Sequence, residues 1–269
     1  MTKQWQGIHG KQPLLQKVVF DVRYHFGYTY LDNCGRCLNM IMHDHPEWFM
    51  RDGASPSSAP LVSLTNSACL NFSSTRYDLS IEKVPGEDPV SEEDVLELFS
   101  QSDYIHDIIS TYLGLAEFSR IGFRAWYLFG CDSEEEAERW LKSLGCYTIS
   151  PALPSAFKGT LEDTGVSVLI AGPDRKYRIA FHGVQRTAQV DFGQGLLTLQ
   201  PRYMHTGQKK ALTDRERLKK RMRQNPDFAA MIDIDAFQEN PHVIAPSRFL
   251  QSSKEQFLPM LAKACETEG

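Results

Sequence analysis

The sequence lacks the local motifs of common catalytic and nucleotide-binding sites. It contains no Gly-x-Ser-x-Gly, no Gly-x4-Gly-Lys-Ser/Thr, no Gly-x-Gly-x-x-Gly and no His-Glu-x-x-His. These motifs mark a nucleophilic serine, two kinds of phosphate-binding loop and a catalytic zinc site. Their absence argues against an enzyme without excluding one, because catalytic triads need not be local in sequence. We also expect no cofactor.

Long apolar runs are missing as well. No window approaches the roughly 18 consecutive apolar residues of a membrane span, so no membrane partner is expected. The N-terminal residues carry no basic region followed by an apolar run, which argues against a secretory signal. Six scattered cysteines do not form the pattern of a disulfide framework. Together these absences predict a protein of the reducing cytoplasm.

The composition is that of a globular protein. The chain has 269 residues, of which 42% are hydrophobic, enough to bury a sizeable core. This length allows one large domain or two small ones. The net charge of −5 gives no overall reason to expect a nucleic acid as a partner.

Residues 120–145, near the middle of the chain, have the clearest strand–turn–helix pattern. Apolar residues alternate with polar ones from Ile121 to Phe129, which predicts a strand with one face on a core. Ser133, with Glu136 three residues later, predicts the start of a helix. Gly145 is suited to end that helix in a left-handed conformation.

The rest of the chain gives further alternating strands and amphipathic helices. We expect one helix opened by Ser91 and Asp94 that reaches about Phe118. Pro259 is expected to kink or divide a C-terminal helix. The expected strands are 18–26, 61–64, 70–81, 166–171, 177–181, 184–192 and 228–237, and the expected helices are 32–42, 91–118 and 247–265.

This pattern predicts an α+β fold, in which helices pack on one face of an antiparallel sheet. Residues 1–14 are expected to form an N-terminal arm. Residues 15–118 and 119–269 share a β-α-β-β-(β)-α order, although no residue identity supports a duplication. We expect the two halves to form one continuous domain, with residues 201–226 as a basic insertion.

Three segments resemble a family of uncharacterised bacterial proteins of similar length and sporadic distribution. They are the RIGFR strand (120–124), the MIDID strand (231–235) and the helical tail that follows. The resemblance spans most of the chain but departs at residues 207–224. It implies no activity, because none is assigned to the family.

Cys34 and Cys37 form a Cys-x-x-Cys motif between an expected strand and an expected helix. This is where redox-active dithiols lie in thioredoxin-like folds. A zinc site is the second interpretation, with His43 and His45 downstream, although these two point to opposite sides of a continuous helix. The third interpretation is two ordinary cysteines near a helix start.

Asp233 and Asp235 share one face of an expected strand and lie about 7 Å apart along it. Two carboxylates at this spacing can bind a divalent metal that activates water or a phosphate. Asp191 is the best candidate for a third ligand. The alternative is that both belong to the solvated face of a half-buried strand.

Residues 207–224 are strongly basic. Eight cations stand against Asp214 and Glu216, which gives 8 − 2 = +6. The segment is expected either to contact an acidic protein or a nucleic acid, or to be a solvated insertion. The cations are Lys209, Lys210, Arg215, Arg217, Lys219, Lys220, Arg221 and Arg223.

The leading hypothesis from the sequence is a non-catalytic interaction protein, which acts through its sheet surface or through residues 207–224. The alternative is a metal-dependent phosphoryl-transfer enzyme or nuclease that uses Asp233 and Asp235.

Overall fold

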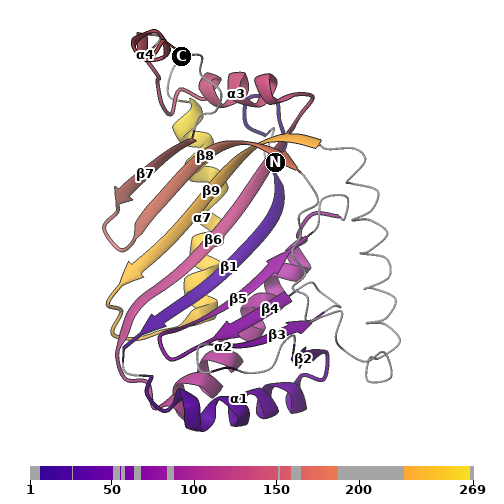
Figure 1. Cartoon of the computed structure of the whole chain (residues 1–269), viewed down its shortest axis with the longest axis vertical. Helices are drawn as coiled ribbons and strands as arrows, with labels where there is room; N and C mark the ends of the chain where they lie inside the picture. The colour runs from indigo at the N-terminus through magenta and orange to yellow at the C-terminus, as the bar shows by residue number, and fades with distance from the viewer. Residues whose placement is uncertain are drawn as a thin grey trace, which may run out of the picture.

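A nine-stranded antiparallel sheet forms the centre of the computed structural model (Figure 1). The structure describes residues 7–25, 27–50, 55, 58–63, 68–83, 88–150, 152–158, 165–186 and 227–266. The strand order is β2-β3-β4-β5-β1-β6-β9-β8-β7. The strands are β1 (Leu14–Tyr24), β2 (Trp48–Met50), β3 (Ala59–Ser63), β4 (Ala68–Phe72), β5 (Arg76–Glu82), β6 (Phe118–Cys131), β7 (Gly165–Ala171), β8 (Lys176–Arg186) and β9 (Asp227–Glu239).

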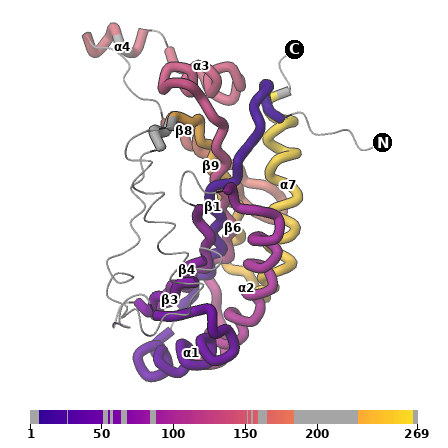
Figure 2. Tube along the Cα trace, turned by 90° about the vertical axis from the view of Figure 1, so that its right-hand side faces the viewer, coloured from indigo at the N-terminus to yellow at the C-terminus, as the bar shows by residue number. Residues whose placement is uncertain are grey.

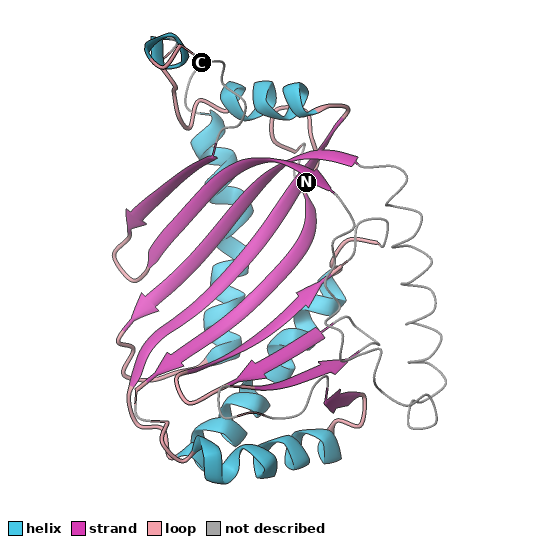
Figure 3. Cartoon of the chain, viewed as in Figure 1, coloured by secondary structure: helices cyan, strands magenta, loops and turns pink. Residues whose placement is uncertain are grey.

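Two long helices cover one face of this sheet, and shorter helices lie near its two ends (Figures 2 and 3). The covering helices, α2 and α7, pack against each other, and among the described residues no helix covers the opposite face of the sheet. We call that opposite face the open face. The helices are α1 (Tyr30–Asp44), α2 (Glu92–Leu113), α3 (Glu134–Ser143), α4 (Ala152–Ala156) and α7 (Pro246–Glu266). This arrangement confirms the predicted α+β fold.

The two halves of the chain fill the sheet from its middle outward. From the central β1·β6 pair, the first half adds β5, β4, β3 and β2, whereas the second half adds β9, β8 and β7. Each half therefore places its first strand at the centre of the sheet and its last strand, β5 or β9, directly beside that first strand. Among the described residues, the second half repeats this order of strands with one strand fewer.

The central unit forms as its residues predict. Ser133 accepts a hydrogen bond from the backbone N–H of Glu136, which caps α3. Glu136 does not close the box on Ser133 but accepts from the N–H of Asp132. Gly145 takes a φ of 71°, the left-handed conformation expected at the end of this helix.

The long helix α2 has both expected start signals. The side chains of Ser91 and Asp94 each accept from the backbone N–H of the other, which forms a complete capping box. The helix ends earlier than the expected Phe118, because Gly114 takes a φ of 63° and stops it at Leu113.

Several expected boundaries were wrong. The expected strand 70–81 is a hairpin of β4 and β5, because the Ser73 hydroxyl accepts from the N–H groups of Thr75 and Arg76 and turns the chain. Strand β2 was missed. The strands expected at 177–181 and from 184 onward are one strand, β8, and residues 187–192 lie outside the described residues. Pro259 lies inside α7 and does not divide it.

The first described residues are held against the rest of the chain. Ile8 is buried in the core, and the carbonyl of His9 accepts a hydrogen bond from Trp140 of α3. Lys11 forms an ion pair with Glu136. The expected arm at 1–14 is therefore anchored from Gly7 onward, and residues 1–6 lie outside the described residues.

Phe123 of β6 connects the sheet to both covering helices. Its ring stacks on Phe257 of α7, with centroids 5.5 Å apart, and meets Phe99 of α2 edge-on at 5.9 Å. Such aromatic pairs stabilise a core beyond the area they bury. Because β6 alternates in and out of the core, Phe123 also fixes which β6 side chains reach the open face.

Candidate functional site: the ionic cluster of the open face

Six charged side chains from β1, β6 and β9 meet on the open face of the sheet. We call them the ionic cluster: Asp21, Arg23, Arg120, Arg124, Asp233 and Asp235.

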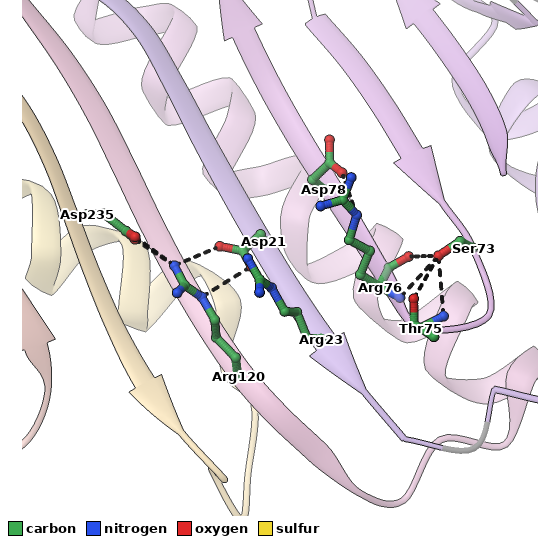
Figure 4. Close-up of polar contacts among 8 residues, drawn as sticks. All are labelled: Asp21, Arg23, Ser73, Thr75, Arg76, Asp78, Arg120 and Asp235. Atoms are coloured by element: carbon green, nitrogen blue, oxygen red, sulfur yellow. Dashed lines mark hydrogen bonds and ion pairs between the residues drawn. The ribbon is translucent and has the colours of Figure 1, made fainter. Parts of the chain in front are cut away.

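Arg120 is the most buried cation of the cluster, and its guanidinium lies between Asp235 and Asp21 (Figure 4). Its Nη2 atom donates to both carboxylate oxygens of Asp235, at 2.7 and 2.9 Å. The same guanidinium reaches Asp21 on the other side, with Nε 3.3 Å from Oδ2. Arg120 also lies over the ring of Phe237, 4.3 Å from its centroid. One arginine therefore joins three adjacent strands.

Burial shapes the charge state of Asp235. Desolvation raises the pKa of its carboxyl group, and the hydrogen bond from Arg120 opposes this rise. On its own, such a buried carboxylate would be strongly unfavourable. Arg120 thus stabilises the ionised form of a group that burial would otherwise neutralise.

Arg124 holds the second carboxylate of β9. Its Nε donates to both oxygens of Asp233, at 2.8 and 3.0 Å, and its Nη2 also contacts Oδ2. This contact raises the pKa of Arg124. Beside the pair, Trp126 lies between two cations, with Lys17 4.5 Å and Arg124 5.4 Å from its ring.

Gly122 makes room for the cluster. It lies between Arg120 and Arg124 on β6 and is in register with Asp21 of β1. A Cβ atom at this position would stand 2.5 Å from Asp21 Oδ1 and 2.8 Å from Arg120 Nη2. In the RIGFR segment, the missing side chain of Gly122 leaves the space in which the Arg120 side chain lies beside Asp21.

The three carboxylates of the ionic cluster are largely buried, whereas two of its arginines are about half exposed. The side chains of Asp21, Asp233 and Asp235 are 15%, 8% and 11% exposed, whereas those of Arg23 and Arg124 are 49% and 45% exposed. A guanidinium has five N–H donors, and a carboxylate occupies only some of them. The cluster therefore presents donors outward.

Three arginines also stand abreast on neighbouring strands. Arg76 of β5 pairs with Arg23 of β1, and Arg23 pairs with Arg120 of β6. Like charges directly opposite each other destabilise a sheet. The adjacent row, with Asp78 opposite Asp21, compensates in part. Arg76 reaches Asp78 only at 3.9 Å and remains 60% exposed.

The structure places Asp233 and Asp235 on one face of β9, in the expected strand. Each carboxylate, however, is engaged by its own arginine, which competes with a metal for the same oxygens. Among the described residues, no three His, Cys, Asp or Glu side chains are grouped as metal ligands. Asp191 lies outside the described residues.

Cys34 and Cys37 lie within α1 rather than before it. Cys37 is buried in the core, and this burial raises the pKa of its thiol to about 11. A redox-active cysteine needs the opposite shift. His43 bonds to Asp44, whereas His45 lies beyond the helix and bonds to Glu47. The four side chains do not converge.

The eight cations of residues 207–224 lie outside the described residues. No helix in the described part of the chain is both long enough and apolar enough to cross a membrane.

Sequence reasoning missed the arginines of the cluster as site residues. A signal was present. Arg-x3-Arg at 120–124 places two positive charges on the polar face of one alternating strand, and Asp-x-Asp at 233–235 places two negative charges on the polar face of another. What the sequence did not show is that β6 and β9 are neighbours.

The chain was compared with family models, curated proteins and solved structures, and no match was found in any of the three.

Proposed function

We propose that the protein binds an acidic protein partner through the ionic cluster and Arg76 of the open face, and that it works as an interaction protein. The observation that carries this proposal is the row Arg76–Arg23–Arg120, in which the side chains of Arg76 and Arg23 are 60% and 49% exposed. An anionic partner would relieve the repulsion within this row and use its free N–H donors.

The overall charge favours an acidic protein over a nucleic acid. The chain carries −5, whereas nucleic-acid-binding domains are usually basic over a whole face or domain. Carboxylates of a partner also fit the planar guanidinium groups in a bidentate way. Residues 207–224 add a second cationic segment that would strengthen the attraction for the same partner.

The proposal is tested with poly-glutamate peptide and duplex DNA as probes, in titrations at several salt concentrations. Arg23→Glu with Arg76→Glu should lower the affinity for poly-glutamate at least about tenfold, as loss of charge-assisted hydrogen bonds implies. The control is Arg139→Glu with Lys142→Glu. It changes the net charge by the same amount, but on α3 instead of on the open face.

Two results would overturn this function. Equal loss in both double variants would show a general charge effect. Tight binding of DNA, with a log–log salt slope near −0.9 for each phosphate contact, would identify a nucleic acid instead. Asp233 and Asp235 give no specific support to the metal-dependent alternative, because both are paired with arginine.

A further inference from the structure

Strand β7 is an apolar sheet edge. Its residues, Gly165–Ala171, contain no charged residue and no proline. On its inner side it pairs with β8, and among the described residues no strand pairs with its outer side. Val168, Leu169 and Ile170 are 38%, 55% and 47% exposed. Proteins usually protect such an edge with charges, proline or shortness.

The other edge of the sheet is protected in this way. Strand β2 has only three residues, and Trp48 is buried. Strand β7 has seven residues and lacks comparable protection. The two ends of one sheet thus differ, and only β7 offers a strand long enough for stable pairing.

The hydrogen-bonding phase of β7 follows from its turn. Gly172 N–H donates to the Arg175 carbonyl at 2.9 Å, so these two residues form a hydrogen-bonded pair. In an antiparallel ladder such pairs alternate with pairs whose N–H and C=O groups point outward. The outward groups of β7 therefore belong to residues 165, 167, 169 and 171.

We infer that β7 pairs antiparallel with β7 of a second copy of this chain, about a two-fold axis at Val168. This register places Ser167 opposite Leu169 of the copy and Gly165 opposite Ala171. All four outward-facing residues then meet outward-facing residues, so every backbone group on the edge gains a partner. A contact of this kind is isologous and closes at a dimer.

The side chains also match in this register. On the helix-covered face, Val168 meets Val168 of the copy and Val166 meets Ile170, which are favourable β-branched pairs. On the open face, Arg178 is paired with Leu169 of the same copy. Leu169 would lie opposite Ser167 of the second copy, which is paired with Ala180 of that copy. Arg178 therefore does not face its own equivalent. The β7 strand of a second copy therefore satisfies both the backbone and the side-chain conditions of this edge.

An apolar groove of about 460 Å³ adjoins the same strand. Val168, Ile170 and Ile179 of the sheet and Met260 and Leu261 of α7 line part of it. Pairing of the two β7 strands would continue the floor of this groove into the second copy. The groove would then no longer end at an exposed sheet edge.

Cross-linking tests the register. Val168→Cys should form an intermolecular disulfide under mild oxidation, because residues of a non-hydrogen-bonded pair lie at about 4.5 Å between Cα atoms. Leu169→Cys is the matched control, since its equivalent in the copy would be more than about 7 Å away. Cross-linking through Leu169→Cys, or through neither variant, would overturn the register.

Light scattering over a concentration series tests the dimer itself. The wild type should approach twice the chain mass. Ser167→Pro should remain at the chain mass with an unchanged circular dichroism spectrum, because it removes only an outward N–H. A wild type that stays monomeric at every concentration would overturn the inference. If the proline variant fails to fold, the cysteine pair still decides.

Discussion

The sulfur atoms of Cys146 and Cys265 lie 4.0 Å apart, although the two residues are separated by 119 positions in the chain. Cys146 follows α3, and Cys265 lies in the last turn of α7. Their contact is the largest cause of a lowered pKa at Cys146, to about 7. The contact therefore connects the C-terminal end of α7 to the segment that directly follows α3.

We predict that diamide converts this pair into a disulfide. Diamide takes up the two electrons and two protons that the thiols release, and the small remaining gap closes by side-chain rotation. The cross-link should raise the free energy of unfolding by about 2–4 kcal/mol. The measurement is the urea midpoint before and after oxidation, with mass spectrometry of the linked peptides.

Two controls accompany this prediction. Cys146→Ser should remove the gain, whereas Cys34→Ser should not. The rate of alkylation at Cys146 should rise as pH passes through about 7, because the thiolate is the reactive form. Oxidation without any shift in the urea midpoint would contradict the expected cross-link.

Replacement of Arg120 by methionine should leave Asp235 as an unpaired buried charge. The expected loss at neutral pH is about 3–5 kcal/mol of unfolding free energy. Arg120→Met with Asp235→Asn should recover part of this loss. Urea unfolding of the three proteins, with the wild type as reference, gives the comparison.

The pH dependence of this loss has a definite sign. Burial raises the pKa of Asp235 above its unfolded value, so the folded state binds more protons and stability falls as pH rises through the interval between the two. Without Arg120 the folded pKa rises further and that interval widens. The deficit of Arg120→Met should therefore shrink on acidification, and a deficit independent of pH would refute this account.

Gly122→Val should disrupt the ionic cluster although it replaces no charged residue. Its Cβ atom would stand 2.5 Å from Asp21 Oδ1, so the carboxylate or Arg120 must move. We expect a loss of about 1–3 kcal/mol, as for other overpacked positions. Gly130→Val on the same strand, where a Cβ meets no atom within 4 Å, is the control. Equal stability of the two variants would contradict the close packing at Gly122.

Trp140→Ala should cost about 3–5 kcal/mol, as for other buried aromatic truncations. Trp140 and Phe123 are both buried. The indole ring lies 4.5 Å from that of Phe129 and donates to the His9 carbonyl. Thermal unfolding provides the check, and an unchanged midpoint would rule out this packing.

The basic segment 207–224 gives a separate prediction about partners. Reversal of Lys219, Lys220, Arg221 and Arg223 to Glu should abolish binding to an anionic probe through this segment and leave the thermal midpoint nearly unchanged. Titration with poly-glutamate and calorimetry measure the two effects. Loss of folding would instead make the segment a structural part of the protein, and full binding would make it a solvated insertion.

Local signals in the sequence predicted the elements well, because their causes lie within a few residues. The alternation of β6 and the capping box of Ser91 and Asp94 are examples. The Ser73 turn was missed, since an alternating pattern continues across it from β4 into β5.

Pairings between distant residues were beyond local signals. Arg120 and Asp235 are 115 positions apart, and nothing local indicates that β9 inserts between β6 and β8. The charged face was visible in the sequence, but its geometry depends on strand order. For Asp233 and Asp235, the sequence left open a metal site or a solvated strand face, and their pairing with Arg124 and Arg120 became visible only with the strand order.

The position of β9 has a consequence for how the protein is synthesised. It follows every other strand in chain order, yet it pairs along nearly its whole length with both β6 and β8. During translation β6 and the β7–β8 hairpin must wait as unpaired edges until β9 leaves the ribosome. Nascent chains that stop before residue 227 would expose those edges together, and such surfaces aggregate. The strands of the first half can therefore pair with one another before β9 is synthesised, whereas those of the second half cannot complete their pairing until then.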